Sequence, residues 1–412
     1  MVELLAVILT LLSGLIAFVY LLKYVNKNQQ DFPHKLPPGS MGWPFSGETL
    51  GFLKSHKSNS LGSFLKEHCS RYGKVFKSHL FGSPTIVSCD FEFNMYILQN
   101  EGELFPVDYP KVMHNILGKF SVLLSKGDLH RKLRSTIISF VSATKYETKF
   151  LHSMEILVLS TINSWDPNSK QVAFYKEAKR ARKRLAAIIK NIILGRQKSS
   201  NARPVQGGDL LNMILSKQNL SVEEMVSIVL DLLFGGYETT AKLLSLIVYF
   251  LGGASNALQR LKEEHQEIRK RKKEGEPLNW DDYKQMEFTQ KVIYEAMRCG
   301  NVVKFLHRKA VQDVKFKDYV IPAGWKVLPV LSAGHLDPTL FENPLEFDPF
   351  RWNDNSIRKK VAPFGGGPRL CPGADLAKVE TAFFLHHFVL NYRYFTHCTT
   401  HLHILTCMHR LW

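Results

Sequence analysis

A single cysteine stands in a glycine- and proline-rich stretch of the 412-residue chain. Cys371 follows the run Phe364 to Leu370 and precedes the apolar segment 374–390, which has the composition of a helix. A thiol at the start of a helix faces unpaired backbone N–H groups and the positive end of the helix dipole, so we expect a thiolate. With no second cysteine within several residues, a zinc cluster is ruled out locally, and axial ligation of haem iron is the chemistry that suits one such thiolate best.

The residues around Cys371 suit a flat group that carries carboxylates. Gly365 to Gly367 can take backbone angles closed to other residues, and Gly373 leaves room for a macrocycle to lie against the chain. Arg369, two residues before the cysteine, is placed to reach a haem propionate. The alternative is a turn that holds an inert core cysteine, because free cysteine is often merely buried.

The spacing Phe-x-x-Gly-x-Arg-x-Cys-x-Gly over residues 364–373 closely resembles the haem-binding loop of the cytochrome P450 family. The resemblance implies a mainly α fold with a small β-sheet region behind an N-terminal transmembrane helix. It also implies a haem b cofactor whose iron is ligated by Cys371, with Phe364 and Gly373 beside it. The activity implied is a monooxygenase that uses O2 and takes electrons from an NADPH-cytochrome P450 reductase.

A second candidate site begins at Gly127, where a helix is expected. His130 and Arg134 are spaced i and i+4 and therefore share one face. Two donors on one face suit a carboxylate, and the resemblance assigns both residues to a haem propionate. A solvated basic helix face is the alternative. Arg308 is a weaker candidate for the same role.

The longest periodic segment, 222–251, predicts a helix with Gly235 and Gly236 in its middle. Each glycine costs roughly 1 kcal/mol relative to alanine, so we expect close approach and a local distortion there. By itself, an acid followed by a hydroxyl in a helix is unremarkable. The resemblance makes Thr239 a hydrogen-bond partner of bound dioxygen and Glu238 a contributor to proton delivery.

An acid–base pair, Glu295 and Arg298, lies on a helix expected over 290–299. As a surface pair it would contribute little. The resemblance instead buries it behind the haem, where Arg351 of the run Phe347-Asp-Pro-Phe-Arg-Trp completes a structural triad.

The remaining elements are read from composition and periodicity. Alternating apolar residues predict hairpins over 75–87 and 316–330. The segment 105–118 has poor periodicity and predicts a loop. A helix is expected over 178–194; its basic start is either a solvated helix end or a membrane contact.

Leu4 to Leu22 carries no formal charge and is long enough to cross a bilayer as a helix. Lys23 and Lys27 follow it, so the positive-inside rule places the rest of the chain in the cytosol. A cleaved signal peptide is the alternative. We therefore expect a single-pass protein of the endoplasmic reticulum membrane, divided into an anchor (1–24), a proline-rich hinge (25–45), a haem-thiolate domain (46–391) and an atypical tail (392–412).

The chain has 54 lysines and arginines against 37 acidic residues, a net charge of +17. These basic residues are spread along the chain without a nucleic-acid motif, so we do not expect nucleic-acid binding. An anionic lipid surface or an acidic electron-transfer partner explains the charge equally well. The six cysteines show no paired framework, which fits a reducing compartment.

Within the family, the hinge and the Glu295 segment look like plant sterol hydroxylases of the brassinosteroid-forming branch. That likeness implies hydroxylation of a phytosterol side chain, with carbon 22 as a candidate. Two departures matter. The chain looks internally shortened near Arg180, where helices would roof the substrate cavity, and the tail after Asn391 does not resemble the family's closing strands. We therefore expect haem incorporation with little sterol hydroxylation, and an impaired or non-enzymatic isoform stays as the alternative function.

Overall fold

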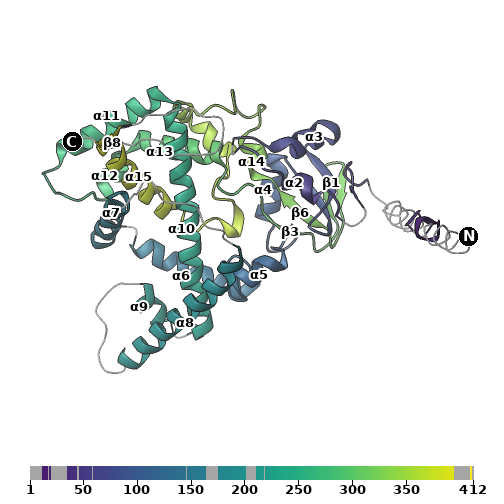
Figure 1. The fold of residues 1–412 in the computed structure, drawn as a ribbon, viewed down its shortest axis with the longest axis horizontal. Coiled ribbons are helices and arrows are strands. Elements are labelled where there is room, and N and C mark those ends of the chain that lie inside the picture. The colour runs from purple at the N-terminus through teal and green to yellow at the C-terminus, as the bar shows by residue number, and fades with distance from the viewer. Residues whose placement is uncertain are drawn as a thin grey trace, which may run out of the picture.

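The computed structural model describes residues 12–16, 18–19, 35–43, 46–57, 59–144, 146–163, 175–200, 210–217, 219–393 and 409–410. They form a mainly helical protein with small β-sheets, which confirms the expected fold class (Figure 1). The α-helices are α2 (Thr49–Phe52), α3 (Gly62–Tyr72), α4 (Phe91–Gln99), α5 (Lys111–Leu117), α6 (Gly127–Thr144), α7 (Thr148–Asn163), α8 (Tyr175–Ser200), α9 (Leu210–Leu215), α10 (Val222–Gly252), α11 (Ser255–Arg271), α12 (Trp280–Gln285), α13 (Glu287–Gly300), α14 (Leu331–His335) and α15 (Ala374–Asn391). The 3-10 helices are η1 (Pro349–Asn353), η2 (Asn355–Lys360) and η3 (Gly367–Arg369), and the strands are β1 (Val75–Leu80), β2 (Ser83–Ser88), β3 (Arg308–Lys309), β4 (Val314–Phe316), β5 (Tyr319–Ile321), β6 (Lys326–Pro329), β7 (Tyr392–Arg393) and β8 (His409–Arg410).

The main hydrophobic core lies among α7, α10, α11, α13 and α15 (Figure 1). Helix α15 is buried around most of its circumference, with Val379, Phe383 and Phe388 fully enclosed. A helix that is apolar all round must be covered on every side, which explains its central place. Burial of each of its large side chains contributes about 1.5–3 kcal/mol. Helix α15 is therefore anchored in the core from Val379 onward, and Cys371 lies just before its first turn.

Helix α10 begins with a capping box that the sequence Ser-x-x-Glu encodes. Ser221 Oγ accepts the N–H of Glu224, and Glu224 Oε2 accepts the N–H of Ser221 at 2.7 Å. The same carboxylate binds Lys132 Nζ of α6 at 2.9 Å through each oxygen. One glutamate thus fixes the start of α10 and ties it to α6.

Four strands form a sheet in the order β1-β2-β6-β3, beside which α2, α3, α4 and α14 lie (Figure 1). The expected hairpin over 75–87 is confirmed, although its turn is Phe81-Gly82 alone and Ser83 already belongs to β2. The hairpin expected over 316–330 is only partly confirmed, because β5 pairs with β4 and not with β6. Strand β6 instead pairs in parallel with β2, because its apolar residues are buried against β2 and α4.

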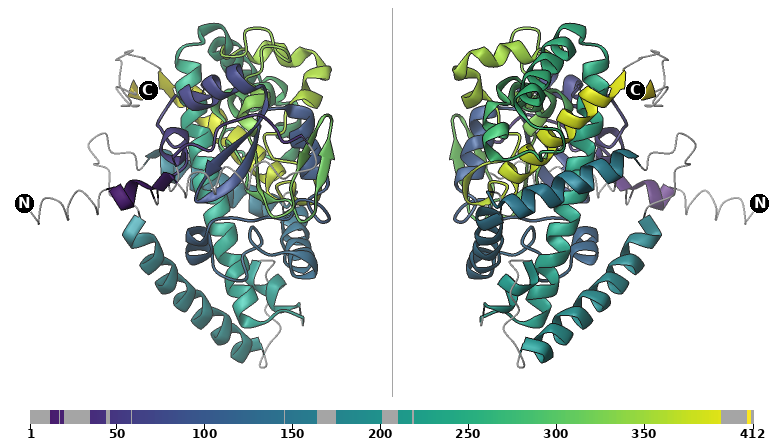
Figure 2. Two further views of the ribbon diagram at one scale, coloured as in Figure 1. Left: turned by 90° about the vertical axis from the view of Figure 1, so that its right-hand side faces the viewer. Right: turned by 90° about the vertical axis from the view of Figure 1, so that its left-hand side faces the viewer.

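The predicted loop 105–118 is partly wrong, because Lys111–Leu117 forms α5. Pro110 precedes it with its fixed φ, and Leu117 buries its side chain, so a short helix forms without strong periodicity. The expected helix over 178–194 lies inside the longer α8, which passes unbroken through Arg180. Figure 2 shows α8 as a long helix at the periphery, and its inner face packs against α10.

Several expectations lie largely outside the described residues. Of the predicted anchor, only residues 12–16 and 18–19 are described, and they are helical. Of the tail, only 392–393 and 409–410 are described, and they pair as β7 and β8. Among described residues, no single helix has the length and apolarity to cross a bilayer; α10 and α11 do so only as a pair with a 115° bend.

Candidate functional site

The loop that carries Cys371 is closed by its own backbone. The Cys371 N–H donates to the Phe364 carbonyl at 3.0 Å, and the Leu370 N–H donates to the Gly367 carbonyl at 3.1 Å. Gly367 has φ +62°, and a Cβ there would lie 2.0 Å from the Leu98 carbonyl oxygen. Only glycine allows this loop to lie against the end of α4.

The electrostatics of Cys371 correct one expectation. Cys371 is exposed at the surface, yet the protein packed around its thiol partly removes it from water, and this desolvation raises the pKa of Cys371. The Gly373 N–H and the charge of Arg134 lower the pKa, as expected for a helix start, yet burial outweighs them. The protein alone therefore does not hold a thiolate. A coordinated metal ion would, because metal coordination deprotonates a thiol.

Three of the predicted cofactor residues lie together beside Cys371. Arg134 is close enough to influence both Cys371 and Arg369, and His130 is close to Arg134 and Arg369. Burial, followed by the charge of Arg369, lowers the pKa of His130 to about 4, so the ring is neutral at physiological pH. A neutral imidazole can donate only one N–H.

Arg308, the weaker candidate from sequence, lies in this group as well. It is 2% exposed, and its Nη1 donates to the His307 carbonyl at 2.9 Å. Its Nε is buried without an acceptor among the described residues. An unsatisfied buried donor costs about 1–3 kcal/mol, so the position makes sense only when an acceptor is supplied from elsewhere.

Arg369 is largely committed to the protein. Its Nε binds Glu101 at 2.6 Å, and its two terminal nitrogens donate to the carbonyls of Val122, Leu123 and Ser125. Four of the five guanidinium N–H groups are thereby used. The predicted propionate contact stays a prediction, and in this structure Arg369 holds the segment before α6 against the cysteine loop.

These residues fit a planar, anionic cofactor with a thiolate ligand. Arg134 supplies positive charge near Cys371, and Arg308, near Arg369, has a buried Nε without an acceptor in the described part of the chain. A Cβ built on Gly373 would meet no atom within 4 Å, so the surface beside Cys371 is open to a flat molecule. The haem that the sequence analysis expected is the group for which this donor set is suited.

The α10 segment is placed differently from the prediction in one respect. The helix continues without a break through Gly235 and Gly236, so the expected distortion is absent. A Cβ on either glycine would meet no atom within 4 Å. Close packing therefore does not explain them, whereas room for a molecule beside the helix does. The Thr239 hydroxyl donates to the Gly235 carbonyl, and Glu238 is exposed next to it.

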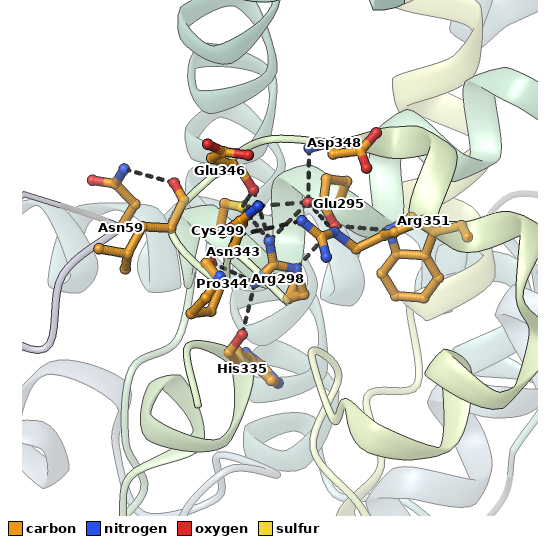
Figure 3. Close-up of polar contacts among 12 residues, drawn as sticks. Asn59, Glu295, Arg298, Cys299, His335, Asn343, Pro344, Glu346, Asp348 and Arg351 are labelled. Atoms are coloured by element: carbon orange, nitrogen blue, oxygen red, sulfur yellow. Dashed lines mark hydrogen bonds and ion pairs between the residues drawn. The ribbon is translucent and has the colours of Figure 1, made fainter. Parts of the chain in front are cut away.

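The predicted structural triad is confirmed (Figure 3). Arg298 donates to both oxygens of Glu295, at 2.9 and 2.7 Å, and Arg351 Nε donates to the same carboxylate at 2.9 Å. All three are at most 9% exposed. Burial raises the pKa of Glu295, but the hydrogen bonds and charge of Arg298 outweigh it, so the pKa lies below its ordinary value.

Sequence reasoning missed several partners of this triad. Trp352 Nε1 donates to Glu295 at 2.8 Å, and Arg298 also donates to the carbonyls of His335 and Pro344. Trp352 follows Arg351 directly in the sequence, and this adjacency to a predicted triad residue could have indicated its contact with Glu295. His335 gave none, since it lies 37 positions from Arg298.

A hollow of about 290 Å³, lined by residues that include Arg260, Glu264 and Phe288, lies between α11 and α13. It is formed by elements other than the cysteine loop, and none of the predicted haem-site residues lines it. We assign it no part in the site.

Comparisons with known proteins agree with this geometry. The family model described as "Cytochrome P450" matches residues 141–406. "Cytochrome P450 724B1" of Oryza sativa subsp. japonica is 48% identical over 419 residues, covering 87% of this chain and 87% of that protein. "Cholesterol 22-monohydroxylase CYP90B51" of Trigonella foenum-graecum is 40% identical, covering 93% and 91%. "Steroid (22S)-hydroxylase" of Brachypodium distachyon is 40% identical, covering 87% and 83%.

A solved structure shares the fold. "Retinoic acid bound cyanobacterial CYP120A1" superposes with a TM-score of 0.74 at 25% sequence identity, covering 87% of this chain and 92% of that one. The arrangement of α10, α13 and α15 around the cysteine loop is therefore a known architecture rather than one particular to this chain.

Proposed function

The chain belongs to the cytochrome P450 family of monooxygenases, and from that premise we propose that it hydroxylates the side chain of a sterol. Two relatives that cover most of the chain carry the printed names cholesterol 22-monohydroxylase and steroid (22S)-hydroxylase. Their identity of 40% supports a shared class of substrate. We place the attack at carbon 22 and include phytosterols among the substrates.

The observation that carries the proposal is the group formed by Cys371, Arg134, His130 and Arg308. Cys371 Sγ would hold the iron of a haem b, while the cationic side chains and the His130 N–H would bind its carboxylates. When bound, the haem supplies the activation of O2 that inserts one oxygen atom into a C–H bond. Arg369 contributes mainly by fixing the loop, through Glu101.

Thr239 and Glu238 are the proposed proton-handling residues. The Thr239 hydroxyl gives its own proton to the Gly235 carbonyl, so its oxygen has free lone pairs that can accept a proton donor. Glu238 lies near the Lys242 ammonium, whose Nζ donates to the Val302 carbonyl at 2.9 Å. An exposed carboxylate beside a fixed cation can exchange protons with water and pass them toward the open face of α10.

We also propose an acidic, NADPH-dependent reductase as electron donor and the endoplasmic reticulum membrane as location. The net charge of +17 supports an acidic partner, because complementary charge raises association rates. The uncharged run from Leu4 to Leu22 supports a single membrane anchor with the catalytic domain in the cytosol.

The test begins with the full chain in detergent or lipid and a carbon-monoxide difference spectrum of the reduced protein. We expect the red-shifted band of thiolate-ligated haem, and its loss in Cys371→Ala with membrane association unchanged. Cys299→Ala is the matched control and should keep the band. An unchanged band in Cys371→Ala would overturn the assignment of the ligand.

The second stage adds NADPH, the reductase, and either cholesterol or a phytosterol, with products identified by mass spectrometry. Oxygen from labelled O2 should appear on the side chain at carbon 22. A haem-loaded protein that oxidises neither sterol would contradict the proposed sterol hydroxylase and favour the impaired isoform, while leaving the haem assignment standing.

A further inference from the structure

Two cysteines that lie twenty positions apart in sequence meet between α3 and the four-stranded sheet. Cys69 is in α3, and Cys89 directly follows β2. Cys89 belongs to the apolar cluster that includes Phe64 and Phe76, and Cys69 packs against that cluster, close enough for the two thiols to influence each other's pKa. The backbone fixes the pair, since the Cys89 N–H donates to the Lys74 carbonyl at 2.7 Å.

The two thiols differ in access. Cys69 is half-buried, so a small solute can reach it, whereas Cys89 is 3% exposed and lies behind it. Lys74 and Asp337, which form an ion pair, lie near both thiols, and the Lys74 ammonium also donates to Thr339 at 3.3 Å. This is the arrangement of an attacking thiol in front and a resolving thiol behind.

We propose that Cys69 and Cys89 form a redox-sensitive pair that hydrogen peroxide converts into an intramolecular disulfide. In the first step, the Cys69 thiolate attacks one peroxide oxygen, the O–O bond breaks, and the products are a sulfenic acid and a hydroxide ion; the hydroxide takes up the proton that the Cys69 thiol released and becomes one water. In the second, the Cys89 sulfur attacks the Cys69 sulfur, the S–O bond breaks, and its hydroxide leaves as a second water with the Cys89 proton. Two thiols lose two electrons and one peroxide gains them.

The electrostatics of the pair point in the same direction. The neighbouring Cys89 thiol is the largest influence that lowers the pKa of Cys69; the charge of Lys74 also lowers it, while burial and the charge of Asp337 oppose them. The pKa of Cys89 is raised by the neighbouring Cys69 thiol and by burial. Deprotonation therefore falls on the thiol that peroxide can reach.

Cys299 provides an internal control. Its side chain is fully buried beside Arg298, and burial raises its pKa to about 12. The raised pKa lowers the thiolate fraction of Cys299, and its full burial keeps peroxide away from the sulfur. We therefore expect peroxide to oxidise Cys69 before Cys299.

The experiment uses the full chain, reduced, freed of reductant and exposed to a small excess of hydrogen peroxide before thiols are blocked with N-ethylmaleimide. Cleavage by trypsin places Cys69 in the peptide 67–71 and Cys89 in the peptide 78–111, so a disulfide joins two separate peptides. We expect this linked pair, which dithiothreitol should separate. Peptide mapping also reports Cys398 and Cys407, which lie outside the described residues.

Two variants sharpen the test. In Cys89→Ser, Cys69 should stop at the sulfenic acid and react with dimedone; in Cys69→Ser, Cys89 should stay a thiol. The inference is overturned if the wild-type peptides stay unlinked at peroxide concentrations that oxidise other cysteines, or if Cys69 links to a residue other than Cys89. Because the readout is a covalent bond, it is independent of haem loading and of sterol turnover.

Discussion

The replacement Arg298→Lys should test how far the buried triad supports the fold. The Arg298 guanidinium donates to Glu295 twice and to the carbonyls of His335, Pro344 and Glu346, and it is 1% exposed. A lysine ammonium carries three donors on a single nitrogen and cannot reproduce the planar fork. At least two of these five acceptors would lose their donor.

The magnitude follows from the burial of these acceptors. Each buried acceptor left unsatisfied costs about 1–3 kcal/mol, whereas the lysine keeps the positive charge beside Glu295. With at least two acceptors unsatisfied, we expect Arg298→Lys to lower the free energy of unfolding by about 2–6 kcal/mol. Since a whole protein is stable by about 5–15 kcal/mol, this is a large share of the total.

The assay is urea unfolding of the detergent-solubilised chain, followed by far-ultraviolet circular dichroism and by haem absorbance. Arg260→Lys is the matched control, because Arg260 is 47% exposed and lies 3.9 Å from Glu263 on the same helix. Exposed pairs contribute about 0–1 kcal/mol, so the control should shift the midpoint little. Equal shifts in the two variants would refute the reasoning that the triad is a buried structural anchor.

Three further outcomes are expected. Thr239→Ala should keep haem binding but divert NADPH consumption into peroxide, whereas Thr239→Ser should stay coupled; tight coupling in the alanine variant would contradict the proton role. The pKa of His335 is lowered by burial to about 3, and its Nε2 accepts the Ala362 N–H at 3.0 Å. The folded pKa lies below the unfolded value of about 6.5, so as the pH falls the unfolded chain takes up a proton at His335 before the folded protein does. Between pH 7.5 and 5.5 this difference should lower the free energy of unfolding by about 1.4 kcal/mol. The variant His335→Asn should lack this part of the pH dependence. Gly367→Ala should abolish haem incorporation, because the added Cβ would lie 2.0 Å from the Leu98 carbonyl oxygen. Gly365→Ala places its Cβ where no atom lies within 4 Å, so this control should lose less haem. A higher haem content in Gly367→Ala than in Gly365→Ala would show that the contact between Gly367 and Leu98 is unimportant.

Local sequence determined the helices and the chemistry of the central loop. The capping box at Ser221, the i, i+3 pair at Glu295 and the spacing around Cys371 are all encoded within ten residues. Short-range patterns of this kind depend on helix geometry and backbone donors, which neighbouring residues fix by themselves. The α10, α13 and α15 helices were therefore predictable to within a few residues.

Tertiary structure decided which distant groups meet. The engagement of Arg369 by Glu101 spans 268 positions, the parallel pairing of β6 with β2 crosses most of the chain, and the Cys69–Cys89 contact joins a helix to a sheet. The sequence indicated a thiolate at Cys371, yet burial among surrounding residues raises its pKa. Such contacts and desolvation depend on how helices and sheet pack against one another, and no short stretch of sequence contains that information.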